Sequence, residues 1–259
     1  MRRVVVIADL HCGHRSGLTP PDWQYQDNSE DQLIAKFGEV QREMWNWYNA
    51  QMAALQPINT LIVNGDAIDG KSEKSGGTEL ITADRHVQVQ IAAECIAAAH
   101  AKKVFIIKGT GYHVGTDEDW EEVLADKVSA RHVGNHEWFD AEGVVIDCRH
   151  QIGGSTIPHG RYTAMARQVL WNALWAEREM QPRADILIRS HRHFYAYCGE
   201  ANWLAISTPA LQGWTKYGSN IVEGTNDIGI ISIDAKGGSY NWQAHLLDMK
   251  FARAKTLAA

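Results

Sequence analysis

Short runs of apolar, mostly β-branched residues alternate along the chain with longer segments of helical periodicity. The run at residues 4–8 (Val-Val-Val-Ile-Ala) predicts a buried strand. Helical periodicity predicts a first helix at about residues 30–55, with Asn28 or Ser29 as its N-cap. Further strands are predicted at residues 60–63, 104–107, 143–148, 185–188, 203–207, 228–233 and 240–247, and further helices at about 78–101, 117–131 and 161–180. This alternation indicates an α/β fold, and since no repeat or linker interrupts it we expect one domain over residues 1–259.

Side chains able to bind metal ions follow five of the predicted strands. They are Asp9 and His11, Asp66, Thr110 and His113, His150, and His191 and His193. The carboxyl ends of strands are where open α/β sheets bind ligands. Single Asp-x-His or His-x-His strings arise easily by chance, whereas their ordered occurrence after successive strands does not. Carboxylate oxygen with imidazole nitrogen suits Mn, Fe, Zn or similar ions, and one carboxylate can bridge two ions about 3.5–4 Å apart.

The local backbone supports this interpretation at two of these strand ends. Asp9 and His11 are two residues apart, so in a strand they would leave from the same face. Gly65 allows a tight turn that lets Asp66 project over the end of its strand.

The composition of the chain argues against several classes of protein, namely those that bind long nucleic acid, are secreted or span a membrane. The chain has 25 Lys and Arg against 31 Asp and Glu, a net charge of −6, which gives no sign of a basic surface for long nucleic acid. Its four cysteines are scattered singly, which is typical of reduced thiols in a cytoplasmic protein. We expect no secretory signal, and no membrane span because no apolar segment approaches about 20 residues.

Three sequence blocks resemble the calcineurin-like metallophosphoesterase superfamily. The first is Asp9-Leu10-His11 and the second is Gly65-Asp66-Ala67-Ile68-Asp69. The last is Ser190-His191-Arg192-His193, where the family has Gly in place of the serine. The resemblance spans about three-quarters of the chain. It implies a two-sheet β-sandwich flanked by helices (an α/β/β/α arrangement) and an enzyme that hydrolyses phosphate esters with a metal-activated hydroxide.

The resemblance also implies two divalent metal ions, with Mn favoured and Fe, Zn or Ni as alternatives. Asp66 would bridge them and Asp69 would orient a ligand. By the same resemblance the first metal would be held by Asp9, His11 and His193, and the second by Thr110, His150 and His191.

The third block of the family, Gly-Asn-His, has two candidates in this chain. Gly109-Thr110-Gly111-Tyr112-His113 follows a predicted strand, whereas the literal Gly134-Asn135-His136-Glu137 follows no clear buried strand. We favour the first, which makes His113 the general acid and leaves His136 as the alternative. For the lone histidine of the family, His150 ends a predicted strand and His159 is the alternative.

The expected activity is hydrolysis of phosphodiesters of nucleotide type. Arg149 and Arg192 adjoin proposed ligands and could grip phosphate oxygens. Trp214 and Tyr217 could stack on a base, although packing is the commoner role for such residues. The alternatives are a nuclease or nuclease subunit acting on DNA or RNA, and a non-catalytic metal-binding scaffold.

Overall fold

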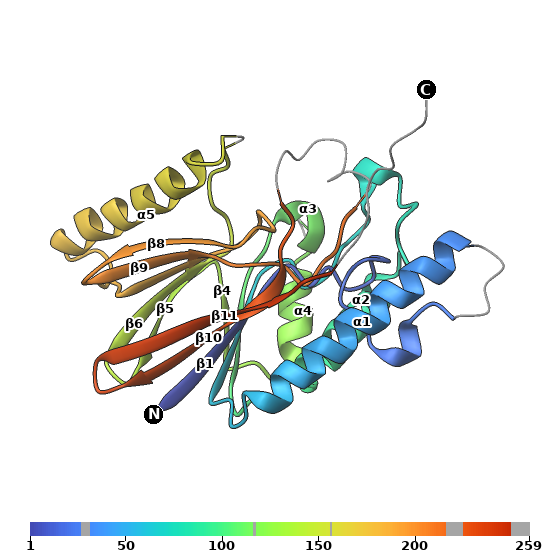
Figure 1. The fold of residues 1–259 in the computed structure, drawn as a ribbon, viewed down its shortest axis with the longest axis horizontal. Helices are drawn as coiled ribbons and strands as arrows, with labels where there is room; N and C mark the ends of the chain where they lie inside the picture. The colour runs from blue at the N-terminus through green and yellow to red at the C-terminus, as the bar shows by residue number, and fades with distance from the viewer. Residues whose placement is uncertain (27–31, 116–117, 156, 216–224, 250–259) are drawn as a thin grey trace.

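The computed structural model describes residues 1–26, 32–115, 118–155, 157–215 and 225–249, which form two stacked β-sheets with helices on both outer sides (Figure 1). The strand order of the first sheet is β11-β10-β1-β2-β3-β4 and that of the second is β5-β6-β7-β9-β8. The two-sheet α/β sandwich expected from the resemblance is therefore confirmed.

The first sheet has a parallel centre. β1 (Arg2–Ile7), β2 (Thr60–Asn64), β3 (Val104–Ile107) and β4 (His132–Gly134) are parallel neighbours. β10 (Ile228–Lys236) runs antiparallel to β1 and pairs in turn with β11 (Ser239–Leu247). The loops that follow β1, β2 and β3 therefore meet at one edge of the sheet, which is where the candidate ligands lie.

The second sheet also has a parallel centre, with one antiparallel strand on each side. β6 (Val144–Arg149), β7 (Ile186–Arg189) and β9 (Trp203–Ser207) are parallel neighbours. β5 (His136–Ala141) and β8 (Ala196–Glu200) are the antiparallel edges.

Helices cover the outer face of each sheet. α1 (Gln32–Ala54), α2 (Arg85–Ala97) and α4 (Trp120–Lys127) contribute to the apolar layer of the first sheet, and α5 (Gly160–Glu177) contributes to that of the second (Figure 1). The short helices are η1 (Pro21–Trp23), η2 (Glu73–Ser75) and α3 (Gly111–Val114). None of the described helices has the length and apolar character needed to cross a bilayer.

Burial of both faces explains the apolar runs of the central strands. In β1, Val4 and Val6 point into the layer between the two sheets, while Val5 and Ile7 point toward the helices. Because successive strand residues face opposite sides, a strand covered on both sides needs apolar residues at every position. This packing gives the loops beyond β1 and β2 a rigid base.

Several elements differ from the prediction. β4, β5 and β8 were not predicted because they are short or half-exposed edge strands without an apolar run. α2 begins at Arg85 rather than near residue 78, because the Asp84 side chain caps it by accepting the backbone N–H groups of His86 and Val87. The proposed caps Asn28 and Ser29 lie outside the described residues.

Candidate metal centre

Five of the predicted ligands have a left-handed backbone conformation. The φ angles are 51° at Asp9, 45° at His11, 51° at Asp66, 75° at His191 and 53° at His193. Such angles cost residues other than glycine about 1–3 kcal/mol each, and they concentrate at functional sites. Five of the ten residues other than glycine that have a positive φ in the described part of the chain are thus proposed ligands at the carboxyl edge of the sheets, as expected of a preorganised site.

The first turn differs from the expected strand geometry. β1 ends at Ile7, so Asp9 and His11 project from a turn beyond the strand rather than from one strand face. This turn is joined to the turn after β2, because the backbone N–H groups of Asp9 and His11 donate to the carbonyls of Gly65 and Asp66, each at 3.0 Å. The two ligand-bearing turns are thus fixed to each other.

Asp9, His11 and His193 form the first candidate metal group. The Nε2 of His193 lies 3.2 Å from Asp9 Oδ1 and 3.3 Å from His11 Nε2, and His11 Nε2 lies 3.9 Å from Asp9 Oδ1. Nitrogens about 2.1 Å from a common ion are themselves roughly 3.0–3.4 Å apart. Asp9 Oδ1 is buried and has no hydrogen-bond partner among the described residues. A buried acceptor without a donor, facing imidazole nitrogens, fits a divalent cation.

Asp69 lies behind His11, where an orienting carboxylate would act. The Nδ1 of His11 is 3.0 Å from Asp69 Oδ1, which leaves Nε2 directed toward Asp9 and His193. Burial raises the pKa of Asp69, but the hydrogen bond from His11 and the charge interactions with His11, His14 and His113 together outweigh burial and lower that pKa to about 2. Burial lowers the pKa of His11 to about 4, so His11 is neutral at pH 7, as a metal ligand must be.

Asp66, His150 and His191 form the second candidate group. His150 Nε2 lies 3.0 Å from Asp66 Oδ2, and His191 Nδ1 lies 3.9 Å from the same oxygen. The other ring nitrogen of His150 donates to the carbonyl of Asn64 at 2.7 Å, which fixes the orientation of the ring. Gly65 is required here: its φ is +87° and a Cβ would clash with the His150 ring.

The charges of this group are strongly coupled. Burial would lower the pKa of His150, but the carboxylates of Asp66 and Asp9 raise it to about 10. Burial likewise disfavours the Asp66 carboxylate, yet His150 holds the pKa of Asp66 well below its usual value. Without a metal, a proton on His150 therefore compensates the buried carboxylates.

The two groups adjoin at Asp9. Its Oδ1 lies 3.9 Å from His150 Nε2 and also within 4 Å of His11 and His193. Burial disfavours the Asp9 carboxylate, but His193 and His150 together hold the pKa of Asp9 below its usual value. The contacts of the Asp66 carboxylate are with the second group, so its bridging role stays a prediction.

The third block places Thr110 and His113 beside these groups. The backbone N–H and the hydroxyl of Thr110 donate to Asp66 Oδ1 at 2.7 and 3.1 Å, so Thr110 orients the Asp66 carboxylate and its role as a ligand stays a prediction. His113 Nδ1 is 2.8 Å from the Asp69 carbonyl, and its ring contacts His11 edge-on with centroids 4.4 Å apart.

The alternative third block lies elsewhere. His136 is on β5, where its Nε2 contacts Asp147 Oδ1 at 2.9 Å and its ring stacks on Trp138. Asp147 also binds Arg189 at 2.7 Å, which makes this a buried polar cluster of the second sheet. In the described part of the chain His136 belongs to no group suited to a metal, and the other alternative, His159, is exposed before α5.

A cavity of about 580 Å³ opens over both metal groups. The predicted Arg192 lines it, but Arg149 is not among the described residues that do. Arg149 is exposed because it precedes His150, and neighbours at a strand end point in opposite directions. Arg161 was missed because it begins a helix. It lies 4.1 Å over the Phe194 ring and donates to Thr225 Oγ1 at 3.3 Å.

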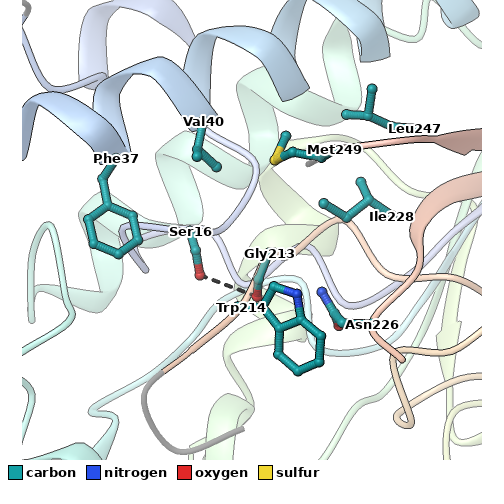
Figure 2. Close-up of a pocket in the computed structure, with 9 residues that line it drawn as sticks. All are labelled: Ser16, Phe37, Val40, Gly213, Trp214, Asn226, Ile228, Leu247 and Met249. Carbon is teal, nitrogen blue, oxygen red and sulfur yellow. Dashed lines mark hydrogen bonds between the residues drawn. The ribbon is translucent and has the colours of Figure 1, made fainter. Parts of the chain in front are cut away.

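Trp214 lies between this cavity and a smaller pocket of about 30 Å³. Figure 2 shows its indole beside Asn226, below the Gly213 carbonyl to which Ser16 donates at 3.5 Å. One side of the small pocket is formed by Phe37 and Val40 of α1. Trp214 therefore both packs against the fold and lines the large cavity. Tyr217 lies outside the described residues.

Glu121 is a second residue that the sequence did not reveal, because an acidic residue on an acidic helix is usually solvated. Here it is fully buried on α4, and it accepts the backbone N–H groups of Ala67 at 3.1 Å and Gly109 at 2.6 Å. It thereby joins the turns that carry Asp66 and Thr110. Burial raises the pKa of Glu121 to about 8.

Comparison with known proteins gives similarity at the level of structure. No family model matches the sequence, and no curated protein matches it. An archaeal phosphodiesterase has 12% identity, with 94% of this chain and 99% of that chain covered at a TM-score of 0.49. Vps29 from Chaetomium thermophilum has 11% identity, with 95% and 97% covered at 0.49. Wild-type Vps29 from Entamoeba histolytica complexed with Zn²⁺ has 15% identity, with 94% and 98% covered at 0.44.

These similarities are too distant to carry an argument about activity, so the assignment depends on the chain itself. Two mixed sheets with flanking helices place Asp and His side chains at successive strand ends, in the order of the sequence blocks. The chain has the two-sheet α/β sandwich that the resemblance of its sequence blocks to the calcineurin-like metallophosphoesterases implies.

Proposed function

We propose that this chain is a metal-dependent phosphoesterase that holds two divalent ions and hydrolyses small phosphodiesters of nucleotide type. The observation that supports this most is the convergence of two Asp/His groups on Asp9 Oδ1, a buried oxygen without a hydrogen-bond partner, beside a large cavity. A purely structural polar cluster would satisfy its buried acceptors with donors.

The ligand chemistry supports divalent ions bound by nitrogen and oxygen. Asp9, His11 and His193 would hold one ion, and Asp66, His150 and His191 the other. This donor set suits Mn, and also Fe, Zn or Ni. When bound, such ions lower the pKa of water and neutralise charge on phosphate oxygens.

The protein supplies orientation. Asp69 fixes the His11 ring, the Asn64 carbonyl fixes His150, and Thr110 fixes the Asp66 carboxylate. Because these hydrogen bonds hold the ligand side chains from within the protein, we expect little reorganisation when a substrate binds.

His113 is the proposed general acid. The contact of its Nδ1 with the Asp69 carbonyl leaves Nε2 as the nitrogen that can give a proton to the leaving oxygen. Its side chain is 18% exposed and lines the cavity, so it can meet a substrate. No covalent intermediate with the protein is required.

The cavity lining suits a compact, anionic and partly aromatic ester. Arg161 and Arg192 supply cations for phosphate oxygens, and Tyr112 and Trp214 supply aromatic surface for a base. Long nucleic acid is bound through many contacts between phosphates and Lys or Arg side chains, and a chain with a net charge of −6 gives no sign of a surface that supplies them.

Metal loading tests the proposed centre. Metal-free protein reconstituted with Mn²⁺ should hold two ions per chain by elemental analysis. Asp66→Asn should weaken binding about tenfold or more, since it keeps the shape but removes the charge. Asp126→Asn, on the exposed face of α4, is the matched control and should load normally. Protein without metal after reconstitution would contradict the proposal.

The pH dependence of loading follows from His150. Its raised pKa, about 10, means that the metal-free site keeps a proton below that pH. A metal needs the unprotonated ring, so the apparent Mn²⁺ affinity should rise up to tenfold per pH unit as pH increases toward 10. Calorimetry at pH 8 in buffers of different ionisation enthalpy should detect a released proton. Loading that releases none would show that His150 is not a ligand.

The third block is tested by two histidine variants. His113→Ala should lower kcat by about 10²–10⁴-fold on a chromogenic phosphodiester, because a general acid is lost. His136→Ala should have a mild effect on kcat, since His136 contacts Asp147 away from the cavity. Thermal melts would check that both variants fold. The reverse ranking would identify the block at Gly134 as the functional one.

The preferred size of the substrate is tested by measuring kcat/KM for a short and a long substrate over a series of salt concentrations. We expect kcat/KM for a dinucleotide to exceed that for a long single strand and to depend weakly on salt concentration, because few phosphates are contacted. Preference for the long strand with a steep salt slope would instead indicate a nuclease. The absence of turnover on any ester in a metal-loaded protein would indicate the scaffold alternative.

A further inference from the structure

The outward face of α5 is apolar over two helical turns. Leu170, Trp171, Leu174 and Trp175 are each between 38% and 58% exposed. Residues four apart are neighbours on a helix, so these four side chains form two adjacent pairs. The opposite face of α5 packs on the second sheet through Ala164 and Met165.

Two further apolar side chains near the ends of α5 are exposed, Tyr162 near its start and Met180 just after its end, at 50% and 69% exposure. In Figure 1, α5 lies outermost on the second sheet, on the opposite side of the sandwich from α1. Apolar side chains grouped in this way on the outer face of one helix mark an interaction surface.

Opposite charges flank these apolar residues at equal distances on either side of Asn172. Leu170 and Leu174 are two residues before and after Asn172, and Arg167 and Glu177 are five residues before and after it. Arg167 and Glu177 are both exposed. Two antiparallel helices centred near Asn172 would therefore bring each Leu170 level with Leu174 of the other copy, and each Arg167 level with Glu177 of the other copy.

From this symmetry we propose that the apolar face of α5 binds a second copy of this chain, with the two α5 helices antiparallel about a two-fold axis near Asn172. A two-fold axis makes each contact twice, so the contact of Leu170 with Leu174 and the ion pair of Arg167 with Glu177 each occur two times across the interface. A parallel pair of helices would instead place Arg167 of one copy beside Arg167 of the other, and the repulsion of these like charges disfavours that arrangement.

The length of α5 limits the expected affinity of the dimer. The helix has 18 residues and is about 27 Å long. A contact through one helix of this length is expected to bury less than the roughly 800 Å² per partner of a standard interface. The dimer should therefore form reversibly and depend on protein concentration. The proposal does not depend on phosphoesterase activity.

Sedimentation equilibrium over a protein concentration series tests this dimer. Wild-type protein should show a monomer–dimer equilibrium, and Leu174→Asp should abolish it. Val123→Asp, which replaces an exposed apolar residue on α4, is the matched control and should leave it unchanged. Circular dichroism melts would establish that each variant is folded.

Charge reversal tests the antiparallel register. Arg167→Glu alone and Glu177→Arg alone should each weaken the dimer by about tenfold, because each puts like charges level with one another at two symmetric positions. The double variant R167E/E177R should restore wild-type association. A monomer at every concentration would overturn the proposal, as would a dimer insensitive to Leu174→Asp. Failure of the double variant to restore association would overturn the antiparallel pairing, and binding of a monomer to lipid vesicles would assign this face to a membrane instead.

Discussion

The buried carboxylate of Asp9 is the constraint on which the site depends. One of its oxygens is enclosed by nitrogens of His11, His150 and His193 but accepts no hydrogen bond, and the other accepts the backbone N–H of His191 at 3.1 Å. A buried anion is costly unless it is compensated. The imidazoles of His150 and His193, which follow strands of the second sheet, provide that compensation, and a divalent cation would provide more.

Assembling this cluster requires an unusual backbone. Ligands from four turns must converge, and five of them have positive φ, which costs several kcal/mol in total. Strands buried on both faces offset this cost, because their apolar contacts hold the ends of β1, β2, β6 and β7 in place. The packing energy of the sandwich thus offsets the strain of the turns that present charged side chains to the cavity.

A second layer of residues fixes the proposed ligands from behind. Asp69 orients His11, while Thr110 and Glu121 fix Asp66 and its turn. The altered third block, Gly109 to His113, contributes to this layer. In place of an amide side chain, the turn after β3 supplies two donors to Asp66 and brings His113 against His11.

The sequence alone determined the α/β class, the two-face burial of the central strands and seven of the Asp and His residues that converge, because apolar runs and strand-end polar residues are local signals. It did not reveal β4, β5 and β8, whose half-exposed residues carry no apolar run. Only the tertiary structure showed that His113 lies beside the Asp and His groups and His136 does not, that Arg149 is not among the described residues lining the cavity, and that Arg161 and Glu121 lie at or behind the site. Those outcomes depend on which loops meet in space and on which side of a strand end each side chain leaves, and neither is encoded in short-range spacing.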